Sequence, residues 1–360
     1  MAYMANEERY QIMKYNRCGK SGLMLPMVSL GLWHNFGSNA SMDNMKAMCF
    51  KAFDLGITHF DLANNYGPEI GSAEYNFGKI LHEDLYPYRD ELIISTKAGY
   101  KMWEGPYGDG GSRKYLIASV DQSLRRMGLE YVDIFYHHRM DPKTPLEETM
   151  EALNTIVKSG KALYAGISNY DGPTMARAVE ILEELKCPFV INQNRYSIFD
   201  RTIELNGLKK TAKRMRKGII AFSPLAQGLL TDRYLNGIPE NSRIRADGRF
   251  LTEAALTPER LEQIRALNEI AAGRGQTLAQ MALSWVLKDE DVTSVLIGAS
   301  SPEQIEENVG IINQTGFTEN ELAEIDRISL RSKILYSFKY KPGCLSKFKC
   351  INRKKEIFLS

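Results

Sequence analysis

The residues best suited to chemistry in this chain follow three predicted strands in a row. Asp61 ends one apolar run and is followed by Tyr66, Lys97 ends the next run, and His137 and His138 end the one after. An acid, a phenol, an amine and an imidazole would therefore lie at the carboxyl ends of neighbouring strands. In a parallel barrel these ends form one face, and barrel enzymes keep their active sites there.

Together these side chains could reduce a carbonyl group. The reference pKa of tyrosine, about 10, is too high for efficient proton donation at neutral pH. We expect the Lys97 ammonium to lower the pKa of Tyr66 and the Asp61 carboxylate to hold that ammonium in place. A nearby imidazole would orient the carbonyl oxygen. Since no side chain supplies a hydride, a cofactor must supply it.

Each residue also has a structural interpretation. Asp61 could cap a turn, and Tyr66 could be an ordinary loop residue among 18 tyrosines. Lys97 could extend from a strand end to solvent, and a histidine at a strand end is more often structural. The convergence favours the functional interpretation, because a buried lysine must be paired or neutralised and Asp61 is its natural partner. A Schiff-base aldolase with Lys97 as the nucleophile stays open as an alternative.

The elements that must position these residues are short apolar runs alternating with amphipathic stretches. Near-continuous apolar character is typical of strands buried on both faces. The runs are Val28–Leu32, Ile57–Leu62, Leu92–Lys97, Val132–His137, Leu163–Ile167, Phe189–Asn192, Ile219–Ser223 and Val295–Ile297. Eight strand-then-helix units predict an α/β fold, a (β/α)8 TIM barrel. A doubly wound sheet is the rival, but no GxGxxG follows the first strand.

Two further features complete the predicted barrel. Met13–Arg17 and Leu23–Pro26 flank the turn Gly19–Gly22, which predicts an N-terminal β-hairpin that caps the barrel floor. The long segments Gly99–Ser112 and Gln227–Leu256 would leave the carboxyl ends of strands, where loops carry function.

Composition restricts the class of protein. The chain has 360 residues and a formal charge of +2, which favours neither nucleic acid nor a membrane surface as a partner. No stretch approaches the ~18 apolar residues of a membrane helix. Five scattered cysteines without a CxxC pair indicate neither a disulfide framework nor a zinc site, so no metal is expected. The first residues lack a basic-then-apolar secretion pattern, and we expect a cytoplasmic protein.

The charge is unevenly distributed. Residues 331–360 hold nine Lys and Arg and one acid, which is +8 and leaves −6 for residues 1–330. We therefore expect one domain over 1–330 and a basic tail over 331–360, disordered or docked at the periphery.

The chain resembles the aldo-keto reductase family. The resemblance rests on the motifs DLANNYG at 61–67, STK at 95–97, DIFYHH at 133–138, GISN at 166–169, IIAFSPL at 219–225 and LIGASSPEQ at 296–304, and on Glu307-Asn308. It covers about residues 14–328 in order, and it implies the barrel fold. It also implies a catalytic tetrad of Asp61, Tyr66, Lys97 and His138. His138 is chosen over His137 because it fits the family spacing Asp-x-aromatic-x-x-His. Alternation along the strand agrees in part, since only one of two adjacent residues should point into the site.

The resemblance also implies an NADPH site. Trp33 matches a pocket residue, and with Asp61 it belongs to the expected site. Ser168, Asn169 and Gln193 match the residues that hold the nicotinamide carboxamide, and Phe222 matches the aromatic residue that stacks on the nicotinamide. Ser223, Leu225 and Gln227 match the pyrophosphate turn. Gly298, Ser300, Gln304, Glu307 and Asn308 match the adenosine half. Arg233 and Arg243, in the long seventh-strand loop, suit phosphate charges, although either could lie on a solvated loop face.

A narrower resemblance, to the bacterial reductases of L-glyceraldehyde 3-phosphate and the related potassium-channel β-subunit branch, rests on LGLWHNFG at 30–37, NNYGP at 64–68 and AQGLL at 226–230. It implies NADPH-dependent reduction of that aldehyde and of methylglyoxal by a homo-oligomer, a tetramer or octamer. Arg139, Lys101 and Arg113 are candidates, by position, for the substrate phosphate. A slow NADPH-binding redox sensor is the alternative that the sequence leaves open.

Overall fold

The structure is a computed structural model that describes residues 3–235, 237–238, 240, 244 and 251–338, with side chains up to residue 330. The chain divides into two compact units, Met1–Phe317 and Thr318–Ser360.

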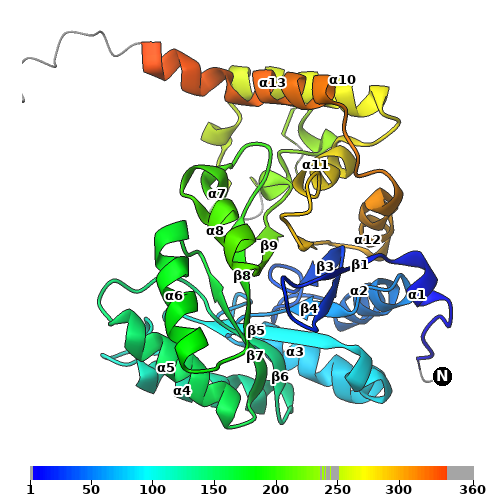
Figure 1. The fold of residues 1–360 in the computed structure, drawn as a ribbon. Helices are drawn as coiled ribbons and strands as arrows, with labels where there is room; N and C mark the ends of the chain where they lie inside the picture. The colour runs from blue at the N-terminus through cyan, green and yellow to red at the C-terminus, as the bar shows by residue number, and fades with distance from the viewer. Residues whose placement is uncertain (1–2, 236, 239, 241–243, 245–250, 339–360) are drawn as a thin grey trace, which may run out of the picture. The chain divides into compact units, whose positions relative to one another are not determined.

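The first unit is built on a closed barrel of parallel strands in the order β10-β3-β4-β5-β6-β7-β8-β9. Figure 1 shows strands of this barrel and the helices beside them. The eight strands are β3 (Val28–Gly31), β4 (His59–Asp61), β5 (Ile93–Ala98), β6 (Val132–His137), β7 (Ala162–Ser168), β8 (Phe189–Arg195), β9 (Gly218–Phe222) and β10 (Ser294–Ile297). The predicted (β/α)8 barrel is therefore confirmed, and the doubly wound alternative is wrong.

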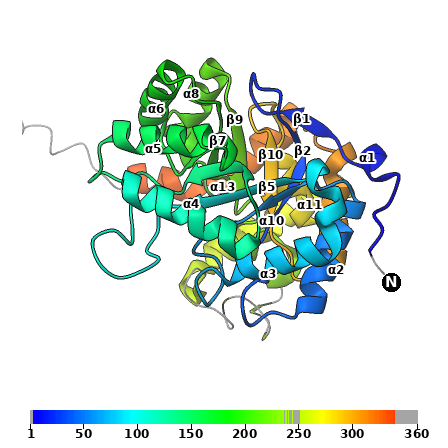
Figure 2. The ribbon, with the colours of Figure 1, turned by 90° about the horizontal axis from the view of Figure 1, so that it is seen from below.

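Helices surround the strands, and Figure 2 shows α2 to α6 and α8 around the strands of the barrel. The described helices of this unit are α1 (Arg9–Ile12), α2 (Met42–Asp54), α3 (Ser72–Ile80), α4 (Arg113–Met127), α5 (Leu146–Lys158), α6 (Gly172–Glu184), α7 (Thr202–Leu205), α8 (Leu208–Met215), α10 (Pro258–Gly273), α11 (Leu278–Val286) and α12 (Pro302–Val309), and α13 (Glu319–Phe338) belongs to the second unit. Among the described residues, none of these helices is long and apolar enough to cross a membrane.

Helix α4 shows how the local sequence sets these elements. Ser112 caps its first turn by accepting a hydrogen bond from the Tyr115 amide. Its buried face includes Leu116, Val120 and Leu124, which recur at helical spacing. Gly128 then ends the helix at φ 66°, a left-handed conformation that glycine adopts without a steric penalty.

The predicted N-terminal hairpin is also confirmed. β1 (Tyr15–Arg17) and β2 (Met24–Pro26) pair antiparallel. Cys18 and Leu25 of this hairpin pack with interior residues of the barrel such as Ile134 and Ile191. The contact is close, because a side chain at Gly218, the first residue of β9, would meet Cys18 Sγ at 2.5 Å. The hairpin therefore closes the end of the barrel where the strands begin.

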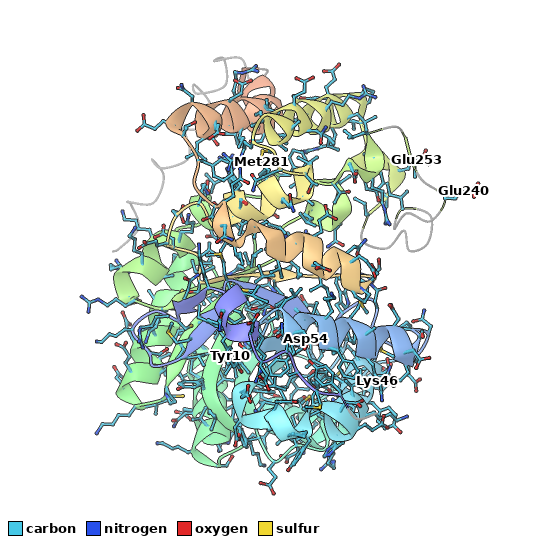
Figure 3. All side chains as sticks on the ribbon, turned by 90° about the vertical axis from the view of Figure 1, so that its right-hand side faces the viewer. Tyr10, Lys46, Asp54, Glu240, Glu253 and Met281 are labelled. Carbon is cyan, nitrogen blue, oxygen red and sulfur yellow. The ribbon has the colours of Figure 1, made fainter. Side chains whose placement is uncertain are left out.

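The two long loops leave the opposite end, after β5 and β9. The exposed side chains of Glu240 and Glu253, on the second loop, point outward in Figure 3. Strand β8 runs three residues beyond the predicted end at Asn192. The polar residues Gln193 and Asn194 stay in the ladder because each finds a buried hydrogen-bond partner.

The second unit contains α13. Thr318 caps this helix: its hydroxyl accepts from the Glu321 amide at 3.2 Å, and its own amide donates to the Glu321 carboxylate at 2.7 Å. The helix continues past residue 330, where the predicted domain ends. Residues 339–360 lie outside the described part of the chain, so the role of the basic tail stays a prediction.

Candidate active site

A buried ion pair at the ends of β4 and β5 forms the centre of the site. Lys97 Nζ donates to Asp61 Oδ2 at 2.5 Å and to the Leu62 carbonyl at 2.7 Å, and the two paired side chains are fully buried. Asp61 Oδ1 also accepts from Ser95 Oγ at 2.7 Å and from Gln193 Nε2 at 3.1 Å. Burial lowers the pKa of Lys97, while Asp61 opposes that shift by favouring the ammonium. The structure thus pairs Asp61 and Lys97 as expected.

Tyr66 lies beside this pair, on the loop between β4 and α3. Lys97 Nζ is 5.1 Å from the centroid of its ring. Burial, and then the Asp61 carboxylate, raise the pKa of Tyr66 well above its usual value. The expectation of a lowered pKa for Tyr66 is wrong for this structure, because burial of the phenol is the largest influence and it raises the pKa. Tyr66 is therefore a protonated phenol, the form that can give up a proton.

Two adjacent histidines at the end of β6 have different neighbours. The His138 ring lies 6.0 Å from the Tyr66 ring, centroid to centroid, in an edge-to-face arrangement. His137 Nδ1 instead lies 2.7 Å from the Tyr170 hydroxyl. Burial, with the nearby Lys97 charge, keeps the pKa of His138 well below its usual value, so its imidazole is neutral. The structure therefore brings His138, and not His137, to Tyr66.

Tyr100 is part of the same cluster, and the sequence argument missed its role. Its ring lies 4.7 Å from the His138 ring at an interplanar angle of 90°. Its carbonyl accepts from the Tyr115 hydroxyl at 2.5 Å, and the Arg139 guanidinium lies 4.5 Å from its ring centroid. Its place just after strand β5 is the signal that could have identified it. Ser95 could likewise have been found, because it lies two residues before Lys97 and so faces the same side.

The residues expected to hold a nicotinamide carboxamide lie next to the tetrad, at the ends of β7 and β8. Gln193 contacts Asp61 directly. The Asn169 amide donates to the Gln193 carbonyl at 2.9 Å, and Asn169 Nδ2 donates to the His138 carbonyl at 3.0 Å and to Ser168 Oγ at 3.2 Å. Asn169 holds φ at 59°, an uncommon conformation for a residue with a side chain. These contacts hold the three amide and hydroxyl side chains together at the ends of β7 and β8, beside Asp61 and His138.

Trp33 and Phe222 are the two aromatic residues expected in the cofactor site. Trp33 follows β3, and its ring centroid lies 6.1 Å from that of Tyr66. Phe222 ends β9, is partly exposed, and lies 5.8 Å from the Arg195 guanidinium. Trp33 therefore borders the tetrad, and Phe222 offers an accessible ring at the adjoining strand end.

The expected pyrophosphate turn has an unusual backbone. Ser223, Ala226 and Gln227 all have positive φ, at 52°, 48° and 62°, and Gly228 follows at 98°. Such conformations cost free energy in residues with side chains and gather at functional sites. The turn is held by internal hydrogen bonds, including Gln227 Nε2 to Ser223 Oγ at 2.9 Å, and Leu225 lies between them.

The expected adenosine residues lie at β10 and α12. The Ser300 amide and hydroxyl bond to Gln304 Oε1 at 2.8 and 3.0 Å. Gly298 and Glu307 are exposed, and Asn308 is buried. The first turn of α12 thus presents an ordered, accessible helix N-terminus, which favours an anion.

Some of the cationic side chains expected to bind phosphate are exposed, and others form ion pairs with nearby acids. Arg233 is exposed on a short turn after Leu230, and Arg243 lies outside the described residues. Arg139 Nη2 pairs with Asp109 at 2.8 Å, and Lys101 pairs with Glu104 at 2.6 Å. Arg113 is exposed at the start of α4. Of the three candidates for a substrate phosphate, Arg139 is the one held against the tetrad cluster, through Tyr100.

This arrangement can perform acid catalysis on a carbonyl group. A protonated Tyr66 and a neutral His138 lie side by side, next to the buried Asp61–Lys97 ion pair. Both groups can donate a hydrogen bond to one oxygen atom. The strand ends of β7, β8 and β9 and the start of α12 provide polar and aromatic groups that suit a dinucleotide.

Comparison with known proteins agrees with this chemistry. The family model described as the aldo/keto reductase family matches residues 27–330. The L-glyceraldehyde 3-phosphate reductases of Escherichia coli O157:H7 and of strain K12 are each 60% identical over 330 residues, which is 91% of this chain and 95% of each relative. A putative voltage-gated potassium channel subunit beta of Schizosaccharomyces pombe is 37% identical over 301 residues, 81% of this chain and 86% of that protein. The chain is therefore an oxidoreductase and belongs to the aldo/keto reductase family.

Proposed function

We propose that this protein reduces L-glyceraldehyde 3-phosphate to glycerol 3-phosphate with NADPH, and that it also accepts methylglyoxal. The surroundings of Tyr66 are the main support for the proposal, because its protonated phenol lies beside the neutral His138 and the Asp61–Lys97 pair. The 60% identity to reductases named for this phosphorylated aldehyde supports the choice of substrate.

The described residues fit a nicotinamide cofactor. Ser168, Asn169 and Gln193 are buried or partly buried polar groups at the ends of β7 and β8, and Phe222 offers a ring on which a flat heterocycle can stack. The strained turn from Ser223 and the first turn of α12 suit the phosphates. When bound, NADPH supplies the hydride that the carbonyl carbon takes up.

The chain's own residues supply the proton and the orientation. The aldehyde oxygen accepts hydrogen bonds from the Tyr66 hydroxyl and from an N–H of the neutral His138 imidazole. As negative charge develops on that oxygen, the Tyr66 O–H bond breaks and its proton passes to the oxygen, which becomes the alcohol. The Lys97 ammonium stabilises the phenolate that Tyr66 becomes, and Asp61 keeps this ammonium in place.

The geometry argues against the aldolase alternative. Lys97 Nζ donates to both the Asp61 carboxylate and the Leu62 carbonyl, within 2.7 Å of each. A Schiff-base lysine needs a free, uncharged amine. The sensor alternative keeps the same site, so the rate of turnover distinguishes it. A cytoplasmic location and a homo-oligomeric assembly stay predictions.

The test is NADPH oxidation with a panel of L-glyceraldehyde 3-phosphate, methylglyoxal and glyceraldehyde, for the wild type and for Tyr66→Phe. We expect the variant to lose about 100-fold or more in kcat, while it binds NADPH with nearly unchanged affinity by fluorescence titration. Equal turnover in the two proteins would contradict the role of Tyr66 as the proton donor. Wild-type turnover of less than about one per minute on all three aldehydes would favour the sensor instead.

A further inference from the structure

A continuous series of buried hydrogen bonds reaches the active-site carboxylate along four neighbouring strands of the barrel. It runs from Ser294 on β10 to Ser29 on β3, then to His59 on β4, to Ser95 on β5, and ends on Asp61. The four links measure 2.7, 2.9, 2.9 and 2.7 Å. All five side chains are fully buried.

Strand pairing explains why these residues meet. His59 and Asp61 are two residues apart on β4 and so face the same side, as do Ser95 and Lys97 on β5. Asp61 lies opposite Ser95 in the β4–β5 register. The small serine side chains leave room for the His59 ring between them.

The available donors and acceptors allow only one orientation for this series of hydrogen bonds, in which each group donates toward Asp61. A carboxylate only accepts, so the single hydroxyl proton of Ser95 goes to Asp61 Oδ1. Ser95 Oγ must then accept from His59 Nε2, which places the proton of the ring on that nitrogen. His59 Nδ1 in turn accepts from the Ser29 hydroxyl, which accepts from Ser294.

The neutral form of His59 agrees with this direction. Burial lowers its pKa to about 4; among the charged neighbours, Lys97 adds to the shift and Asp61 opposes it. A protonated ring would donate from both nitrogens and reverse the link to Ser29. The proton of Ser294 would then have only the Met27 carbonyl, at 3.5 Å, as its acceptor.

We propose that His59 is a positioning residue for the reduction: its Nε2–H holds the Ser95 hydroxyl so that the hydroxyl proton goes to Asp61, which fixes the Asp61 carboxylate against Lys97. This role rests on the proposed use of Tyr66 as the proton donor. Without the hydrogen bond from His59, the Ser95 hydroxyl can turn away from Asp61. The Asp61 carboxylate can then rotate, and the Lys97 ammonium that stabilises the Tyr66 phenolate moves with it.

The test compares His59→Gln with His59→Asn. A glutamine amide N–H lies as many bonds from Cβ as Nε2 and can still donate to Ser95. An asparagine amide reaches only the position of Nδ1 and can bond only Ser29. We expect the asparagine variant to lose about 10- to 100-fold in kcat, because small misplacements at a reacting centre have effects of this size. The glutamine variant should recover most of that loss, and both should keep the wild-type affinity for NADPH by fluorescence titration.

The variant Ser95→Ala provides a second, independent test of the same proposal. It removes the link to Asp61 without changing the histidine, so it should lower kcat as His59→Asn does, and the double variant should be no worse than either single variant. The proposal is overturned if glutamine and asparagine have equal effects on kcat, or if the effects of the two sites add.

Tyr66→Phe, measured beside these variants, separates the two proposals. If Tyr66→Phe is inactive while His59→Asn and Ser95→Ala turn over at the wild-type rate, only the role of His59 fails. If Tyr66→Phe keeps the wild-type rate, the proposed mechanism fails, and the role of His59 fails with it.

Discussion

Two buried ion pairs lie at opposite ends of the barrel strands. Near the strand starts, Arg89 Nη1 lies 3.0 Å from Asp133 Oδ2, the second residue of β6. At the strand ends, Lys97 pairs with Asp61 at 2.5 Å. Both acids also accept hydrogen bonds from neighbouring groups, Asp133 from the Ile94 amide at 2.8 Å. The two interactions are therefore alike in kind, in burial and in the presence of extra donors.

They differ in the cation and in what surrounds it. Arg89 presents a planar guanidinium, which lies 4.4 Å from the Tyr131 ring centroid. Lys97 has a pKa lowered by burial and lies beside Tyr66 and His138. We therefore expect the Arg89–Asp133 pair to serve stability, whereas the Asp61–Lys97 pair serves the reaction in the mechanism proposed above. The two pairs thus differ both in the cation and in the end of the strand at which they lie.

Replacing Lys97 and Arg89 in turn tests whether the two ion pairs have different roles, and it should give the largest effects. Lys97→Met should lower kcat about 100-fold or more, because Tyr66 loses the charge that stabilises its phenolate. Arg89→Met should instead lower the free energy of unfolding by about 3–5 kcal/mol, because it leaves Asp133 buried and unpaired. Urea unfolding and aldehyde turnover per folded molecule, measured on both variants, check this.

The matched control is Arg89→Lys, which keeps a positive charge but loses the planar contact with Tyr131. It should fall between the wild type and Arg89→Met in stability and leave turnover unchanged. A variant at Arg89 that stays folded but reduces aldehydes slowly would show that the two ends of the barrel are not separate in function.

The strand ends should also make folding depend on pH. Burial lowers the pKa of His137 to about 4. Below its ordinary pKa of about 6.5, the unfolded chain binds a proton that the folded chain excludes. The stability contribution of His137 is therefore full above pH 6.5 and is lost as the pH falls toward 4, at up to about 1.4 kcal/mol per pH unit.

Urea unfolding at several pH values between 7 and 4.5 tests this. The asparagine variant His137→Asn can keep the hydrogen bond to the Tyr170 hydroxyl but does not titrate. Its free energy of unfolding should fall less steeply than that of the wild type over this range. Parallel curves for the two proteins would contradict the prediction.

A smaller effect is expected at Arg139, which follows the end of β6. Because its guanidinium is partly exposed and lies over Tyr100, it can exchange Asp109 for a substrate phosphate. Arg139→Met should raise KM for L-glyceraldehyde 3-phosphate roughly tenfold, the value of one charge-assisted hydrogen bond. KM for methylglyoxal should change little.

Asp109→Asn is the matched control, since it frees Arg139 from its present partner. It should lower KM for the phosphorylated aldehyde or leave it unchanged. If Arg139→Met raised KM equally for both aldehydes, Arg139 would have no role in phosphate recognition, and its effect would be on the pocket as a whole.

The sequence by itself determined the barrel and the strand ends from which its chemistry comes. Apolar runs predict strands because a strand inside a barrel is buried on both faces, and Val132–His137 is β6 with both ends as predicted. Asp61, Lys97 and the pair His137 and His138 follow from their places at the ends of such runs, and the family resemblance selects His138. These features are local, since a few neighbouring residues decide them.

Only the tertiary structure decided how these groups act on one another. The contact of Gln193 with Asp61 spans 132 residues and exists because the barrel closes. Burial in the closed fold raises the pKa of Tyr66, although the nearby lysine predicted the opposite direction. The pairing of Arg139 with Asp109 depends on how a loop folds back over the strand ends. Hydrogen bonding and desolvation depend on distances across the fold, and strand periodicity carries no information about them.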